Sequence, residues 1–209
     1  MTYAVRMMQA RCAALGFWPG PIDGVEGRRT RAAYAAAVES QRAKGLPFQH
    51  SSGITQIRLH WTGGTHKANG TDRSRYHFLA EGDGKVIFTV PPETHLSHTR
   101  HANGGAIGLS VCCMAGAVER PFNPGRFPMT TVQLHALAHQ AAVWCMFFDI
   151  PVTQWSVMTH AEVQITLGIR QRNKWDITWI PGMERPGDPI MVGNKIRSIV
   201  RSKIASLAA

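Results

Sequence analysis

The stretch Ile54-Thr55-Gln56-Ile57-Arg58-Leu59-His60-Trp61-Thr62 has the composition of a β-strand and carries a histidine near its end. Residues 76–79 and 86–90 are strand-like as well, and the turn Gly82-Asp83-Gly84 between them predicts a β-hairpin. Residues 106–114 predict a further apolar strand. The centre of the chain therefore supplies the strands of one sheet.

Two long segments in the second half of the chain predict helices. Residues 131–148 have helical length and place their apolar side chains on one face, and Thr130 or Thr131 suits the N-cap. Residues 192–207 form a basic amphipathic pattern that can lie on a membrane, but we expect this helix to pack on its own domain. We therefore predict an α/β domain over residues 54–209, with a mixed central β-sheet flanked by helices.

The composition and charge indicate an ordinary globular protein with an anionic partner. Of the 209 residues, 44% are hydrophobic and 17% are charged, which excludes the disordered and fibrous classes. The formal net charge of +10 predicts attraction to nucleic acid, anionic lipid or anionic cell-wall polymers. No zinc-finger spacing, RNP-like motif or lysine block accompanies this charge, so we expect no nucleic-acid partner.

The cysteines and the first residues bear on the compartment. The four cysteines suggest no disulfide framework, and we expect buried thiols made in a reducing compartment. Residues 1–17 lack a charged segment followed by an uninterrupted apolar one, so we expect no signal peptide. No apolar run is long enough to cross a bilayer. A target outside the cytoplasm therefore requires another factor to deliver the protein.

Three residues far apart in the chain, His60, His160 and Asp176, have side chains that a zinc ion prefers. A catalytic zinc site takes three nitrogen, sulfur or oxygen donors from protein and leaves one position to water. No HExxH motif is present, so these residues must converge through the fold. A strand-end histidine taken alone is more often structural. The three together predict a metal hydrolase.

Several short motifs surround these three residues in a fixed order. They are His60-Trp61-Thr62, Tyr76-His77-Phe78-Leu79, Asp83-Gly84, His98-Thr99, Asn103, Ala106-Ile107-Gly108, His160-Ala161-Glu162-Val163 and Lys174-Trp175-Asp176. In this respect residues 54–180 resemble the N-acetylmuramoyl-L-alanine amidase type 2 family, which includes phage T7-like lysozymes and the peptidoglycan recognition proteins. The resemblance extends over most of the predicted α/β domain.

That resemblance implies the roles of the central side chains. His60, His160 and Asp176 are the implied ligands of Zn²⁺. Tyr76 and Lys174 are the implied catalytic groups, which face the reacting carbonyl and stabilise the tetrahedral oxyanion. The implied reaction is hydrolysis, by zinc-activated water, of the amide that joins N-acetylmuramic acid to L-alanine in peptidoglycan. We expect a monomer whose cleft walls, including His98 and Asn103, contact the substrate.

Three departures from the family pattern weaken parts of this assignment. Ser110 stands where many amidases carry a glutamate as general base, which makes the T7-like branch the nearer comparison. The interval of 16 residues between His160 and Asp176 is long for the family, and the usual D-P-G continuation is missing. Asp149 and Glu162 remain as fallback carboxylates, although we expect Asp149 at the surface and Glu162 behind a ligand.

Residues 1–44 predict a small helical unit, in which a turn-rich loop joins two helices. Its motifs are Leu15-Gly16-Phe17, Pro21-Ile22-Asp23-Gly24, Gly27 and Thr30-Arg31-Ala32-Ala33. They resemble the peptidoglycan-binding domain 1 family, whose members anchor enzymes to the cell wall. Residues 45–53 are the predicted linker. With no signal peptide expected, the resemblance suggests a phage endolysin that reaches the periplasm after holin-type release.

Other functions remain open at this point. A non-catalytic cell-wall recognition protein would keep the fold without the metal, and Ser110 favours it. A glycosidase needs two carboxylates about 5 to 9.5 Å apart, and the 13 acidic residues show no recognisable pair. A helical hairpin without a ligand remains the alternative for residues 1–44.

Overall fold

The computed structural model describes residues 5, 8–9, 11–12, 15–21, 23–44 and 53–208. The predicted linker, apart from Gly53, and much of the predicted first helix lie outside these residues.

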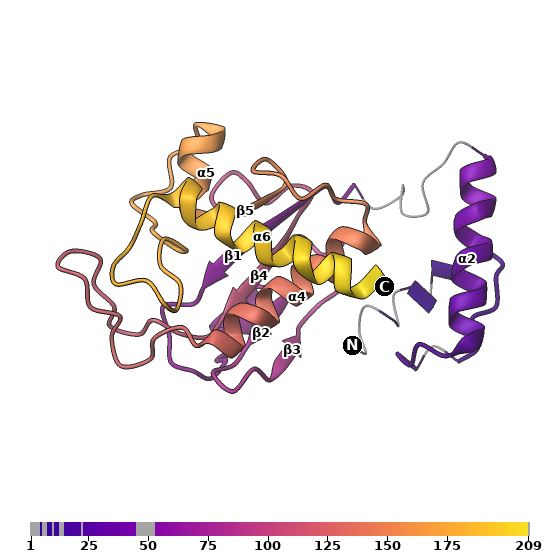
Figure 1. Ribbon diagram of the computed structural model, residues 1–209, viewed down its shortest axis with the longest axis horizontal. Coiled ribbons are helices and arrows are strands. Elements are labelled where there is room, and N and C mark those ends of the chain that lie inside the picture. Colours follow the sequence, from indigo (N-terminus) through magenta and orange to yellow (C-terminus); the bar gives the residue numbers. More distant parts are fainter. Residues whose placement is uncertain are drawn as a thin grey trace.

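One five-stranded sheet forms the centre of the fold, in the order β3-β2-β4-β1-β5 (Figure 1). The strands are β1 (Gln56–Trp61), β2 (Phe78–Ala80), β3 (Val86–Phe88), β4 (Ala106–Val111) and β5 (Val157–Thr159). Neighbouring strands are parallel except for the β2–β3 hairpin. The predicted mixed sheet and hairpin are thus confirmed, whereas β5 was not predicted.

The helices are α2 (Arg28–Ala43), α3 (Gly70–Arg75), α4 (Thr131–Phe147), α5 (His160–Leu167) and α6 (Pro189–Ala208). Some of them begin at a capping box, whereas α2 begins after Gly27 without a side-chain cap. Thr130 caps α4 in a capping box with Gln133, as predicted. Helix α2 begins after Gly27, so Thr30 lies within its first turn.

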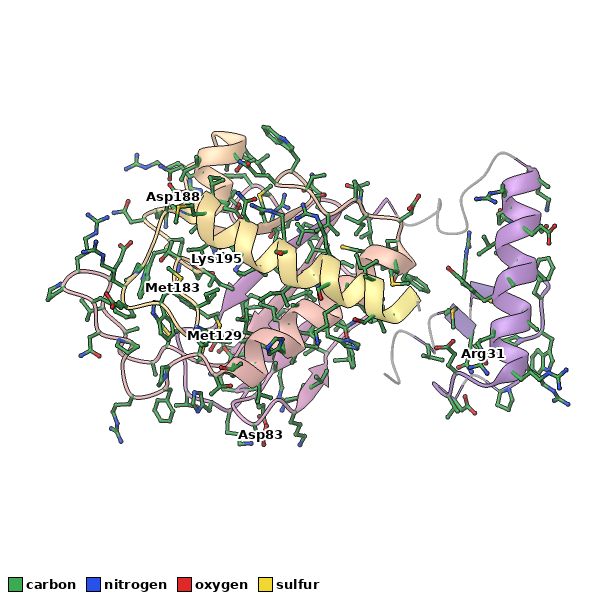
Figure 2. The ribbon with its side chains drawn as sticks, viewed as in Figure 1. Arg31, Asp83, Met129, Met183, Asp188 and Lys195 are labelled. Carbon is green, nitrogen blue, oxygen red and sulfur yellow. The ribbon has the colours of Figure 1, made fainter. Side chains whose placement is uncertain are left out.

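Helices α4 and α6 lie side by side across one face of the sheet (Figure 1). Apolar side chains fill the space between helices and sheet (Figure 2), with Ile57 and Leu59 of β1 and Val192, Ile196 and Val200 of α6 among those buried. The apolar face of α6 is thus covered by its own domain. Among the described residues, no helix is both long and apolar enough to span a membrane.

The four cysteines are free and buried in the structure, as expected. Burial raises the pKa of Cys112 and Cys145 to about 12, and it raises that of Cys12 and Cys113 as well. These thiols are therefore inert packing groups.

A buried glutamine holds the loop that precedes α2. The Gln9 amide nitrogen donates to Asp23 Oδ1 (3.0 Å), Val25 O (3.1 Å) and Thr30 Oγ1 (3.2 Å), and its oxygen accepts from Gly24 N (2.9 Å). Since Gln9 is almost fully buried, its bonds to Thr30 and Gly24 are shielded from water, whereas those to Asp23 and Val25 are only partly shielded. The motif residues Asp23 and Thr30 are therefore partners of one amide.

Candidate metal centre

The two histidines meet because β1 and β5 are parallel neighbours. Leu59 pairs with Thr159, so the next residue on each strand is a histidine, His60 and His160. His60 is the penultimate residue of β1, and His160 is the first residue of α5, directly after β5. Both side chains therefore reach the carboxyl edge of the sheet, where ligands bind in open α/β folds.

Asp176 completes a buried cluster with these histidines. Its Oδ2 lies 2.9 Å from His60 Nδ1 and 3.1 Å from His160 Nδ1. One ligand atom from each of the three residues lies within 4.8 Å of the other two. The residues are 0%, 5% and 6% exposed for His60, His160 and Asp176. The sequence prediction that these side chains converge agrees with this geometry.

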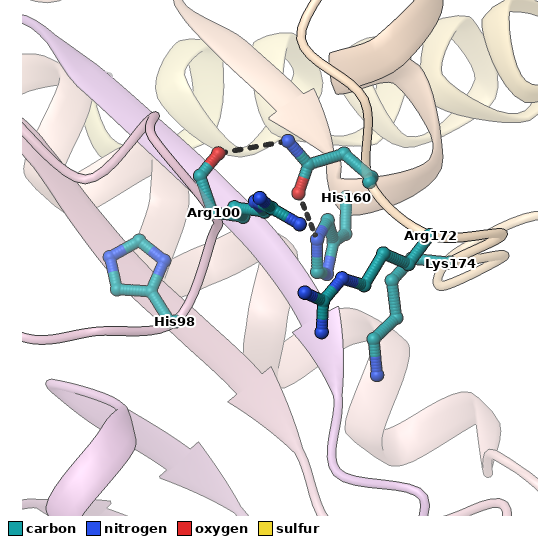
Figure 3. Close-up of a pocket in the computed structure, with 6 residues that line it drawn as sticks. His98, Arg100, His160, Arg172 and Lys174 are labelled. Atoms are coloured by element: carbon teal, nitrogen blue, oxygen red, sulfur yellow. Dashed lines mark hydrogen bonds between the residues drawn. The ribbon is translucent and has the colours of Figure 1, made fainter.

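Gln171 fixes the proton on the far side of the His160 ring. Its amide nitrogen donates to the backbone oxygens of Arg100 (2.9 Å) and Ile169 (3.1 Å), so its oxygen faces His160 Nε2 at 2.9 Å (Figure 3). An amide oxygen only accepts, so His160 Nε2 carries a proton. In the neutral ring, Nδ1 then turns a lone pair toward the Asp176 carboxylate. Two facing acceptors need a cation between them, either a proton or a metal ion.

His60 Nε2, the ring nitrogen that points away from Asp176, also has polar neighbours. Nε2 lies 3.2 Å from Thr99 Oγ1 and 3.2 Å from His98 Nδ1. His98 Nδ1 in turn lies 2.9 Å from Thr99 Oγ1. Both imidazoles thus direct Nδ1 into the cluster and Nε2 outward, which is the arrangement of metal-binding histidines with outer hydrogen-bond partners.

Burial and the shared carboxylate set the charges of the cluster. Burial lowers the pKa of His60 to about 4, although the hydrogen bond to Asp176 opposes it. Burial also lowers the pKa of His160, but the charge and hydrogen bond of Asp176 outweigh it and the pKa is raised. Burial raises the pKa of Asp176, but the charge of His160 and the hydrogen bonds from both histidines lower it to about 2. Near neutral pH the cluster therefore offers the Asp176 carboxylate and the neutral His60 ring. The proton that Asp176 retains on His160 is the one that a bound metal ion would replace.

This donor set fits a zinc ion. Donors around one Zn²⁺ lie roughly 3.3 Å apart, since each bond is about 2 Å long. The two contacts of Asp176 Oδ2 with the histidines, 2.9 and 3.1 Å, are close to that spacing. Two imidazole nitrogens and one carboxylate oxygen leave one tetrahedral position for water or substrate.

A cleft of ≈ 320 Å³ opens onto the cluster. Its lining includes His160 and Asp176, together with Tyr76, His98 and Lys174 from the predicted set. The Tyr76 ring centroid lies 5.1 Å from that of His60. Burial raises the pKa of the Tyr76 phenol, and the negative charge of Asp176 acts in the same direction. Tyr76 is thus a protonated hydrogen-bond donor beside the cluster.

Ser110 lies beside the cluster at the position where a general base was expected. It pairs with His60 across β1 and β4 and is completely buried. Asp176 is the single carboxylate among the residues described as lining the cleft. Of the fallback acids, Asp149 is exposed, and Glu162 is buried in an ion pair with Arg197. Neither is available as a general base in this arrangement.

His98 and Asn103, the two residues expected to contact substrate, have different surroundings in the structure. His98 lines the cleft, and its ring packs on Gly108, where a Cβ atom would lie 2.7 Å from His98 Cδ2. The Asn103 side-chain oxygen instead accepts hydrogen bonds from the backbone amides of His98 (3.1 Å) and Thr99 (2.7 Å). Asn103 thus holds the loop that carries His98, and its contact with substrate stays a prediction.

Sequence reasoning expected Glu162 behind a ligand but did not identify Gln171 or Thr99 as supports of the histidine rings. Gln171 and Thr99 hold the histidine rings, and Glu162 closes a capping box with Thr159 immediately before His160. The S/T-x-x-E pattern of Thr159 and Glu162 was a usable signal for a helix start at His160. No local pattern marks Gln171, whose contacts depend on the fold of the loop around it.

Comparison with known proteins gives one family match and several structural likenesses. Residues 50–183 match the family model for N-acetylmuramoyl-L-alanine amidase. No curated protein matches the sequence significantly. The family assignment therefore rests on the match over residues 50–183.

Two solved structures illustrate the structural likeness. The hydrolase AmiA of Staphylococcus aureus, solved with its ligand, is 13% identical, with 73% of this chain and 74% of that chain covered and a TM-score of 0.48. The endolysin N-acetylmuramoyl-L-alanine amidase LysCS of Clostridium intestinale URNW is 16% identical, with coverages of 72% and 87% and a TM-score of 0.47.

Proposed function

The chain belongs to the N-acetylmuramoyl-L-alanine amidase family, and we propose that it is a zinc-dependent peptidoglycan hydrolase. Its substrate bond is the amide between the lactyl group of N-acetylmuramic acid and L-alanine. The observation that carries the proposal is the buried cluster of His60, His160 and Asp176 at the base of a cleft. Nothing else in the described part of the chain combines three such donors.

Each side chain of the cleft has a definite task in this proposal. A zinc ion held by the cluster would polarise the scissile carbonyl and lower the pKa of water. The Tyr76 phenol, kept protonated by burial, donates a hydrogen bond to the carbonyl oxygen as negative charge develops there. The Lys174 ammonium lies on the same cleft and adds a positive charge. Trp61 and Trp175, whose ring centroids are 4.8 Å apart, line the cleft and give it an apolar wall.

The cleft lacks an acidic general base, and this favours a mechanism without one. Ser110 is buried beside His60, and no second carboxylate lines the described cleft. A non-catalytic recognition protein is the competing function, because it would also lack that acid. The contacts of Gln171 with His160 and of Thr99 with His60 favour the enzyme. Hydrogen bonds of this kind orient histidines that bind a metal ion.

Digestion of purified peptidoglycan distinguishes these functions. The protein, with and without a chelator, is incubated with the polymer, and the new ends are identified by mass spectrometry. New amino-terminal L-alanine that disappears with chelator is the expected result. New reducing sugar ends would indicate a glycosidase. Wall binding without either product would leave the recognition protein.

The proposal extends to residues 1–44 as a wall-binding module. Its loop is held by Gln9, and Trp18 on the same loop is 69% exposed. Tryptophan is enriched at binding interfaces, because its large ring is apolar and its N–H can donate a hydrogen bond. The Trp18→Ala variant of the full chain should sediment less with peptidoglycan but hydrolyse a soluble muramoyl peptide as before. Unchanged sedimentation would remove this loop from the proposal.

A phage endolysin is the setting that we propose for this activity. Its formal charge of +10 suits a target rich in anionic polymer. Added to cells whose outer barrier has been permeabilised, the protein should lyse them, and the His160→Ala variant should not. Lysis by both proteins would show that lysis does not depend on the proposed metal cluster.

A further inference from the structure

A strongly basic hollow adjoins the metal cluster at His160. One part, of ≈ 420 Å³, is lined by Arg100, His101, Arg170 and Arg172. The adjoining part, of ≈ 340 Å³, shares Arg100 and Arg172 and is completed by His98, His160, Gln171 and Lys174. Figure 3 shows Arg100, Arg172 and Lys174 around His160. We call Arg100, Arg170, Arg172 and Lys174 the basic patch.

The loops that carry the basic patch are fastened to each other and to the cluster. Gln171 lies between Arg170 and Arg172 in sequence and is only 3% exposed. Its side chain bonds the backbone of Arg100 on one loop and the ring of His160 at the cluster. The backbone that carries Arg100, Arg170 and Arg172 is therefore held next to the metal ligands, while their exposed side chains extend into the hollow.

The cations of the basic patch lack acidic partners. Among the described residues, none of the four side chains forms an ion pair. Asp176, the acid in the neighbouring cleft, is engaged by both histidines. Four like charges on two adjoining loops repel one another, and an anionic ligand relieves that repulsion. Guanidinium groups in particular bind carboxylates through paired hydrogen bonds.

We propose that the basic patch binds the free carboxylates of the peptide half of the substrate. This inference rests on the proposed function, because the patch adjoins the cleft in which the muramoyl amide would be cleaved. The lactyl carboxyl group of the glycan half is consumed in that amide, whereas the peptide half carries free carboxylates. The peptide therefore extends from the cleft over Gln171, and peptides with amidated carboxyl groups are the poorer ligands.

Binding of the stem peptide alone tests this proposal without requiring hydrolysis. The probes are L-alanyl-γ-D-glutamyl-L-lysine with both carboxylates free and its twin with both as carboxamides. Calorimetric titration of the full chain should show at least about tenfold tighter binding of the carboxylate peptide, since each charge-assisted hydrogen bond contributes that much. The Arg100→Gln/Arg172→Gln variant should bind the two peptides within about twofold of each other.

Lys195→Gln is the control for lost positive charge outside the patch, at an exposed position of α6 (Figure 2). It should retain the wild-type preference. Equal binding of the two peptides by the wild type, or an unchanged preference in the double variant, would overturn the proposal. Because the readout is binding, a carboxylate preference without hydrolysis would support the patch while counting against the proposed catalysis.

Discussion

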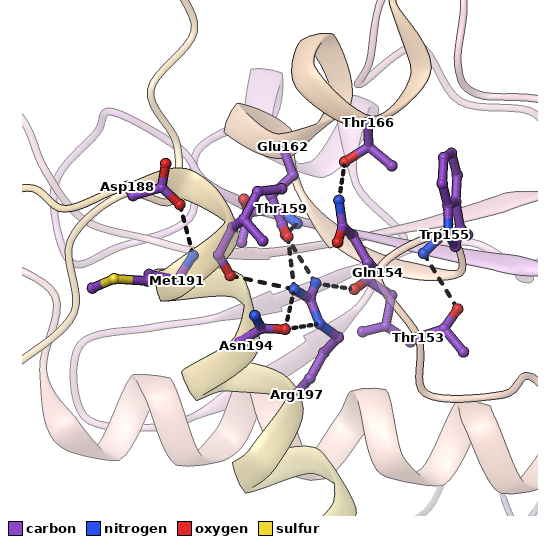
Figure 4. Close-up of polar contacts among 12 residues, drawn as sticks. Thr153, Gln154, Trp155, Thr159, Glu162, Thr166, Asp188, Met191, Asn194 and Arg197 are labelled. Carbon is purple, nitrogen blue, oxygen red and sulfur yellow. Dashed lines mark hydrogen bonds and ion pairs between the residues drawn. The ribbon is translucent and has the colours of Figure 1, made fainter.

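Arg197 of α6 and Glu162 of α5 form a buried ion pair, with 2.8 Å between Nη2 and Oε1 (Figure 4). Arg197 Nη1 also donates to Glu162 Oε2 (3.1 Å) and to the backbone oxygen of Val157 (2.9 Å). Glu162 Oε2 accepts from Thr159 N at 2.8 Å, next to His160. The carboxyl-terminal helix is thereby connected to the helix start that presents a proposed metal ligand.

The Arg197→Met variant should lower the free energy of unfolding by about 3 to 5 kcal/mol. The substitution leaves the Glu162 carboxylate buried without its cation, and burial already raises the pKa of this group. Urea denaturation measures the change. The Lys195→Met control on the exposed side of α6 should stay within about 0.5 kcal/mol of wild type.

The Glu162→Gln/Arg197→Met double variant should be more stable than Arg197→Met alone, because it removes the uncompensated charge. If both variants have equal stability, Glu162 does not depend on Arg197 in the way described.

Replacing Gly193 by alanine should destabilise the protein, although alanine normally favours a helix interior by about 1 kcal/mol over glycine. Gly193 lies one helical turn before Arg197, and a Cβ atom there would collide with the Glu162 carboxylate. Thermal unfolding should therefore show a lower Tm for Gly193→Ala. A raised Tm would mean that α6 and α5 do not approach so closely.

The Gln171→Leu variant should bind zinc about 10 to 100-fold more weakly than wild type. The substitution removes the acceptor that holds the His160 ring and fixes its proton on Nε2. Competition with a chromogenic chelator gives the affinity. Gln154→Leu is the matched control, since its amide bonds Thr166 (3.0 Å) away from the cluster. Equal affinities in the two variants would contradict the role of Gln171.

Tyr76→Phe and Lys174→Met should each reduce kcat on a muramoyl peptide by about 100-fold or more, while zinc content stays unchanged. Each variant removes one donor from the cleft and leaves His60, His160 and Asp176 in place. Steady-state kinetics with metal analysis checks both quantities. An effect confined to KM would assign these residues to substrate binding alone.

The main sheet could be predicted because its longer strands carry a clear local signal. Both β1 and β4 have six residues; β1 alternates polar and apolar side chains, and β4 is mostly apolar. β5 has only three residues and lies in a loop-rich segment, so the sequence carries no local signal for it. Its pairing with β1 identifies it as a strand. That pairing brings His160 beside His60, a contact that the motif order could suggest but local pattern could not.

The helical periodicity of the tail wrongly predicted an exposed side chain for Arg197. The tail pattern groups it with the solvated cations of a basic face, yet it is 1% exposed. The burial of a guanidinium depends on an acid that lies 35 residues away in sequence. The loop that carries Gln171 and the basic patch could not be predicted from local sequence either. Arg172 adopts a left-handed backbone there, with φ of 53°, although arginine has no preference for that conformation.

Zinc titration of the chelator-treated full chain, followed by hydrolysis of the N-acetylmuramoyl-L-alanine amide, tests the central claim most directly. Activity should be absent after chelation and should rise in proportion to zinc until one ion per chain is bound, with a plateau beyond that point. The Asp176→Ala variant should show neither the binding nor the activity. Full hydrolysis by metal-free protein, or zinc uptake by Asp176→Ala with wild-type affinity, would contradict the account.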